Sequence, residues 1–137
     1  MGASMTPPTD ALTAGSIDEL VAGWHELRER HARATSALER ALEEHQLGVS
    51  EYEVLERLAG SGDDACRMQS LHDSVHLSQS ALSRVVGRLE TAGLVERKMC
   101  PDDRRGIFAK ITPAGRERYE AARPTHRRVL GEVLAGK

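Results

Sequence analysis

The sequence predicts a mainly α-helical fold with one small β-hairpin, and three features indicate this fold class. Leu, Ala, Glu and Arg are abundant among the 137 residues, and aromatic side chains make up only 3%. From residue 78 to 92, apolar side chains recur at three- and four-residue spacing, which is typical of one buried helix face. Gly93 then precedes two short runs, 94–100 and 106–112, which we expect to pair as strands around an arginine-bearing tip. A helix followed by such a hairpin is the layout of a winged helix-turn-helix.

A long first helix is predicted from a capping box at Ser16, with Glu19 three residues further on. Gly48 is expected to end this helix. Residues 1–15 are small, polar and proline-bearing, so we expect them to form a disordered tail. The apolar stripe is too long for one small core, and we expect it to pack partly on a second subunit. It consists of Ile17, Leu20, Trp24, Leu27, His31, Ala34, Leu38 and Leu42.

Two further short helices are predicted before the one capped by Ser78. A second capping box, at residues 50–53, opens a helix that buries Leu55 and Leu58. A loop over 60–64 leads to another helix at about 67–75.

Turn chemistry predicts how the helices on either side of the hairpin begin and end. His76 lies in the turn before Ser78, where we expect it to adopt a left-handed backbone conformation. Thr112 and Pro113 have the pattern of a helix cap followed by proline at the first helical position. Pro124 is expected to kink or break this helix and leave a short final one.

The net charge of −2 hides an asymmetry along the chain. Residues 1–66 hold 13 acidic and 5 basic side chains, whereas 67–118 hold 6 acidic and 10 basic ones. Positive charge thus gathers on the helix and hairpin, as expected when one face meets phosphate.

Several protein classes are not expected from this sequence. The chain has no apolar run of membrane-spanning length, no recognisable secretory signal and only two cysteines, so we expect a cytoplasmic protein. It has no phosphate-binding glycine loop, nucleophile elbow or HExxH motif, so we expect neither an enzyme nor a cofactor or metal site.

The polar face of the helix at 78–92 predicts contacts with DNA. Glutamine can pair with adenine and arginine with guanine through two hydrogen bonds, each pairing being worth about 1–3 kcal/mol of discrimination. Lysines and arginines near the hairpin would neutralise phosphates without reading sequence. The candidates are Gln79, Ser80, Ser83 and Arg84 for bases, and Arg88, Arg97, Lys98 and Arg104 for the backbone.

Four motifs together resemble the MarR family of bacterial transcription regulators, over roughly residues 16–134. They are LSQSALSR at 77–84, LETAGLVER at 89–97, DRR at 103–105 and ITPAG at 111–115. These match the family's recognition helix, its LExxGLVxR approach to the wing, its DxR wing tip and its LTxxG exit.

The resemblance implies a single domain over 16–137. Within it, 16–47 and 113–137 would be dimerisation helices and 50–112 the DNA-binding part. The implied homodimer binds a pseudo-palindromic operator with its recognition helices about 34–36 Å apart. The wing pair would be Arg105, which enters a minor groove, and Asp103, which braces it.

The resemblance also implies a repressor that a small, often aromatic or phenolic, effector releases from DNA. Candidate effector residues are Trp24, Arg28, His31 and Tyr52, which would suit an aromatic carboxylate. In the alternative interpretation, Trp24 and His31 only pack in a dimer interface.

Two other functions stay open at this point. A winged helix can serve as a protein-interaction module without binding DNA, because fold alone does not fix function. The chain could also sense oxidants through Cys100 and Cys66, since Lys98 and Arg97 would favour a thiolate at Cys100.

Overall fold

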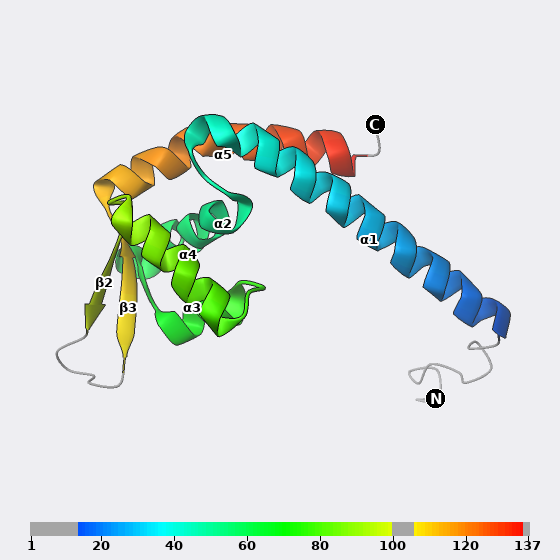
Figure 1. Cartoon of the computed structure of the whole chain (residues 1–137), viewed down its shortest axis with the longest axis horizontal. Coiled ribbons are helices and arrows are strands. Elements are labelled where there is room, and N and C mark those ends of the chain that lie inside the picture. Colours follow the sequence, from blue (N-terminus) through cyan, green and yellow to red (C-terminus); the bar gives the residue numbers. More distant parts are fainter. Residues whose placement is uncertain (1–13, 100–105, 136–137) are drawn as a thin grey trace, which may run out of the picture.

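The computed structural model describes residues 14–99 and 106–135. The structure is mainly helical, with a small antiparallel sheet of strand order β1-β3-β2 at one end of the molecule, so the predicted fold class is confirmed (Figure 1). The wing tip lies outside the described residues, together with Asp103, Arg104, Arg105 and Cys100. None of the described helices is long and apolar enough to cross a membrane. The elements are α1 (Ala14–Leu42), η3 (Glu43–His45), α2 (Val49–Ala59), η4 (Gly62–Asp64), β1 (Ala65–Arg67), α3 (Met68–Ser74), α4 (Gln79–Thr91), β2 (Val95–Met99), β3 (Ile107–Ile111) and α5 (Pro113–Leu134).

Among the described residues, helix α1 contacts the other elements only through its C-terminal part. This part packs along α5, whereas the N-terminal part projects away as an arm (Figure 1). Ala34, Leu38 and Leu42 are buried, so the apolar stripe reaches the core only from residue 34 onward. The large apolar side chains of the arm are exposed; they are Ile17, Leu20, Val21, Trp24 and Leu27.

Both predicted boundaries of α1 are wrong. The helix includes Ala14 and Gly15, so Ser16 lies inside it rather than at its cap. The other residues of the predicted tail, 1–13, lie outside the described range. At the other end α1 stops at Leu42 rather than at Gly48, and Gln46, with φ 58°, takes the left-handed conformation after η3.

Gly48 instead caps α2, which corrects the predicted capping box at residues 50–53. The backbone N–H of Gly48 donates to Glu51 Oε1 at 2.8 Å, and Ser50 lies within the first turn of α2. Glycine is acceptable at an N-cap, and the glutamate three residues later satisfies the free amide.

The hydrophobic core lies between the C-terminal end of α1, helices α2, α3, α4 and α5, and the sheet. Fully burying a leucine or valine side chain contributes about 1.5–3 kcal/mol, so this cluster fixes how α4 sits on the domain. Its most deeply buried members are Tyr52, Leu42, Leu55, Leu58, Leu71, Leu89, Val54, Val86 and Val95.

Strand β1 was not predicted, because the region was assigned to a loop and a helix start. Cys66 pairs with Ala109 of β3, which makes β3 the central strand of a three-stranded sheet, with β1 and β2 on its two sides. The left-handed conformation predicted for His76 is also wrong. Among the described non-glycine residues, only Gln46, Asp63 and Asp64 have positive φ.

Helix α5 continues through Pro124, so the predicted break is wrong (Figure 1). Proline removes a backbone donor and crowds the preceding turn, at a cost of about 3 kcal/mol. Contacts with α1 and η3 offset this cost along the helix. Arg30 of α1 donates to the Leu134 carbonyl near the end of α5, and Arg118 in the second turn of α5 donates to the His45 carbonyl of η3.

Candidate nucleic-acid interface

Helix α4 is held by a cap at its start and by a buried apolar face. Ser78 Oγ accepts from the Ala81 backbone N–H at 3.1 Å, as the sequence predicts. The apolar face packs into the core, so the opposite face must point outward. The buried residues are Leu82, Val85, Val86 and Leu89.

The first two turns of α4 present unengaged polar side chains to solvent. Gln79, Ser83 and Arg84 are exposed, and their side chains make no hydrogen bond or ion pair with the described residues. The Ser80 hydroxyl lies 3.3 Å from that of Ser78. The partial positive charge of a helix N-terminus adds to this surface, so it favours a polyanion.

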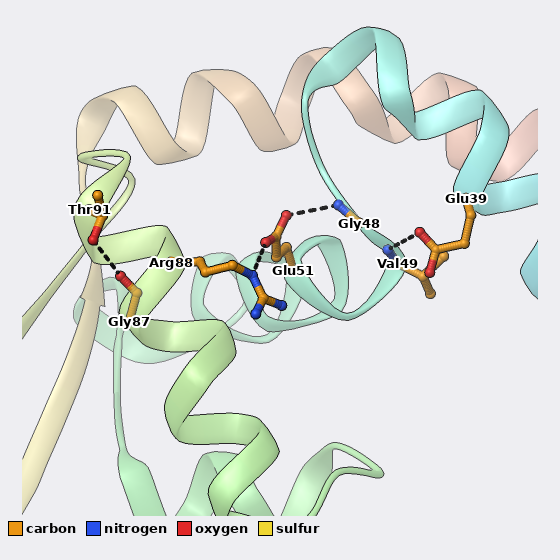
Figure 2. Close-up of polar contacts among 7 residues, drawn as sticks. All are labelled: Glu39, Gly48, Val49, Glu51, Gly87, Arg88 and Thr91. Atoms are coloured by element: carbon orange, nitrogen blue, oxygen red, sulfur yellow. Dashed lines mark hydrogen bonds and ion pairs between the residues drawn. The ribbon is translucent and has the colours of Figure 1, made fainter.

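Arg88 differs from Arg84 because it has an intramolecular partner. Its Nε donates to Glu51 Oε2 of α2 at 2.8 Å (Figure 2). No sequence pattern indicates this pair, since the two residues are far apart in the chain.

Arg97 is not the free backbone contact that the sequence predicts. Its Nη2 donates to the Ser83 carbonyl at 2.9 Å, and its Nε lies 3.3 Å from Glu90 Oε1. Arg97 therefore ties β2 to α4. Lys98, in contrast, is exposed on β2 and pairs only loosely with Glu96, at 3.5 Å.

The four candidate effector residues do not form one site. Trp24, Arg28 and His31 line a groove of about 640 Å³ on α1, and the Arg28 guanidinium lies 5.9 Å from the centre of the Trp24 ring. Tyr52 is fully buried on α2 instead, stacked on His126 with ring centres 4.2 Å apart.

A second groove, of about 460 Å³, lies between α1, α2 and α5, and two of its lining residues, Glu53 and His126, were missed by sequence reasoning. His31, Glu53 and His126 line it together with apolar side chains such as Leu38 and Leu130. Burial raises the pKa of Glu53 and lowers that of His126, so both groups favour their neutral forms. Only the tertiary packing of three helices brings them together, so no local spacing could have indicated this groove.

Cys66 is a poor candidate for a reactive thiol. It is half-buried, and burial raises its pKa, which disfavours the reactive thiolate. Within 14–99 and 106–135, no group of three or more His, Cys, Asp or Glu side chains is arranged to hold a metal ion.

Comparisons with known proteins agree with this geometry. Residues 47–107 match the model of the MarR family. The HTH-type transcriptional regulator MhqR of Bacillus subtilis is 33% identical over 94 residues, and the match covers 69% of this chain. The chain spans 63% of the length of that relative.

Two solved structures from Streptomyces coelicolor resemble the whole fold. AbsC, a MarR family transcriptional regulator, is 32% identical with a TM-score of 0.79, over 90% of this chain and 81% of its own. Sco3205, a MarR family regulator solved in complex with DNA, is 31% identical with a TM-score of 0.80, over 92% of this chain and 77% of its own. This is a family of regulators rather than enzymes, in agreement with the sequence. The chain belongs to the MarR family of transcriptional regulators.

Proposed function

We propose that this chain regulates transcription as a homodimer that binds a pseudo-palindromic DNA operator. The observation that carries the proposal is the unengaged polar face of α4, with Gln79, Ser83 and Arg84 exposed above a buried apolar face. A helix presenting such side chains fits the major groove, where they would pair with base edges. The similarity to Sco3205, which is solved with DNA, supports this assignment.

Dimer formation would use α1 and α5, within the predicted segments 16–47 and 113–137. The α1 arm exposes large apolar side chains, among them Trp24 at 56% and Leu20 at 59%. Leaving so contiguous an apolar surface in water is unfavourable, and a second copy would bury it. Sedimentation equilibrium at micromolar concentration tests this, and a monomer would contradict it.

We infer repression as the sign of regulation, because a dimer seated on a promoter excludes polymerase from the same DNA. A small effector would act by favouring a separation of the two recognition helices that does not fit the operator. Such coupling needs only about 1–3 kcal/mol. The grooves lined by Trp24, Arg28 and His31, and by His31, Glu53 and His126, are the candidate effector sites.

Fluorescence anisotropy with the DNA upstream of the gene for this chain, beside scrambled DNA at two salt concentrations, tests the DNA-binding function. We expect tight, salt-sensitive binding that prefers the upstream DNA. Arg84→Ala should reduce this preference, whereas Arg105→Ala should weaken binding to both DNAs and lower the salt dependence. Absence of binding at low salt would favour a protein-interaction module instead.

A further inference from the structure

Glu51 connects the start of α2 to the recognition helix α4 through both of its carboxylate oxygens. Oε1 accepts from the Gly48 backbone N–H at 2.8 Å, and Oε2 accepts from Arg88 Nε at 2.8 Å (Figure 2). The Glu51 side chain is only 17% exposed, whereas that of Arg88 is 58% exposed. The largely buried carboxylate thus holds a cation that faces solvent.

The way in which Arg88 is held leaves its outer edge free. Only Nε contacts Glu51, and the two Nη nitrogens point away from the carboxylate (Figure 2). They have no polar partner among the described residues. A guanidinium fixed in this way presents two parallel donors, the geometry that binds a phosphate with two hydrogen bonds.

We propose that Glu51 is a positioning residue for DNA binding, which orients Arg88 so that its two Nη groups meet a backbone phosphate. The proposal rests on the DNA-binding function proposed above. An unrestrained arginine side chain loses conformational entropy when it binds a phosphate. Because the Glu51 carboxylate already restricts the Arg88 rotamer in the free protein, less entropy is lost on binding. Glu51 itself does not contact DNA in this arrangement.

The chemistry of Glu51 provides a variant of nearly identical shape. Two N–H donors converge on its carboxylate, from Gly48 and from Arg88. In Glu51→Gln the amide oxygen can accept from only one of them, and the amide NH₂ faces the other donor. The substitution therefore releases Arg88 or the α2 cap.

Glu39 offers a matched control at the same junction. Its Oε1 accepts from the Val49 backbone N–H at 3.3 Å, and no contact joins it to α4 (Figure 2). Because a single donor meets this carboxylate, the amide oxygen of Glu39→Gln can replace it. The control removes one negative charge, as Glu51→Gln does, and is expected to leave DNA affinity within about twofold of wild type.

The experiment is a double-mutant cycle on DNA affinity, with full-length protein, one duplex and several salt concentrations. Arg88→Ala should weaken binding about tenfold and lower the salt slope by about 1.8, because the dimer loses one phosphate contact per protomer at about 0.9 each. Glu51→Gln should weaken binding about three- to tenfold, and the double variant should be no weaker than Arg88→Ala alone. Arg88→Lys should resemble Glu51→Gln, since lysine keeps the charge and the salt slope but lacks the Nε–H that Glu51 holds.

Several results would overturn the proposal. Additive losses in the cycle, unchanged or tighter binding by Glu51→Gln, or wild-type affinity of Arg88→Lys would each show that Glu51 does not position Arg88. Thermal melting of each variant separates this role from stability, because a general loss of folding would lower Tm and would weaken binding by the same factor whether or not Arg88 is present. If wild-type protein binds no DNA, the proposed function and this inference fail together; if it binds and the cycle is additive, only the inference fails.

Discussion

Replacing Gly115 by alanine should destabilise the junction between the wing and α5. A Cβ at this position would overlap the Leu94 backbone carbonyl oxygen and lie 2.9 Å from Ile111 Cγ1. The Leu94 carbonyl oxygen cannot easily move away from the new Cβ, because it accepts a hydrogen bond from the Thr112 backbone N–H at 3.0 Å at the base of the wing. Either α5 shifts outward or this hydrogen bond is lost.

The expected magnitude follows from the cost of overpacking. Forcing a methyl group into a filled site costs about 1–3 kcal/mol, and more where the neighbour is backbone. One kcal/mol shifts Tm by about 4 °C for a domain of this size, so Gly115→Ala should melt about 4–12 °C below wild type. The shift should be measured at equal protomer concentration, since dimer formation makes Tm depend on concentration.

Gly87→Ala is the control for this experiment. Gly87 lies in the middle of α4, and an added Cβ would meet only Arg97 Nη2, at 3.9 Å. Alanine is a better helix former than glycine by up to about 1 kcal/mol, so this variant should melt at or a few degrees above wild type. A Gly115→Ala protein that melts as high as Gly87→Ala would refute the packing argument.

Two further predictions concern His126 and Ser78. Burial lowers the pKa of His126 below its ordinary value of 6.5, so the unfolded chain binds the proton more readily than the folded one. This contribution to stability is therefore full above pH 6.5 and is lost as pH falls from there toward the lowered folded pKa. His126→Phe keeps a ring stacked on Tyr52 but has no titrating group, so the urea unfolding midpoint should change less with pH between about pH 7 and 5 than it does in wild type. If the midpoint of the variant changes with pH as steeply as that of wild type, His126 is not the cause of the pH dependence. Ser78→Ala removes the cap of α4 and should cost about 1 kcal/mol, whereas an unchanged Tm would show that the cap does not stabilise the helix.

Helix α4 could be predicted from sequence because each of its signals is local. The serine cap precedes the helix, Leu82 and Leu89 mark its buried face, and Gly93 takes a positive φ of 79° just after its end. Such signals act within a few residues and need no knowledge of the rest of the fold.

The errors arise where tertiary contacts override local preference. Cys66 lies in a strand only because β3 pairs with it, and Pro124 stays helical because α5 packs along α1. At the junction of α1 and α2, the sequence allows a capping box at residues 48–51 or at residues 50–53. The hydrogen bond from the Gly48 backbone N–H to Glu51 shows that the first of these forms.

The candidate site was predictable as a surface but not as a set of contacts. The outward face of α4 follows from its apolar stripe. Arg88 of α4 pairs with Glu51 of α2, and Arg97 of β2 donates to the Ser83 carbonyl of α4. Neither separation along the chain corresponds to a helical or strand period. The sequence predicts that Tyr52 belongs to an effector site. Its burial against His126 could not be predicted, because it depends on how α2 packs on α5.

Selection of bound sequences from a pool of random duplex DNA tests the central claim most directly. If α4 reads base edges within a homodimer, the wild-type chain should enrich a two-fold symmetric motif whose half-site centres lie about one helical turn apart, roughly 10 base pairs. A pool that stays random, or that enriches only unrelated single sites, would contradict base reading by a symmetric pair of recognition helices.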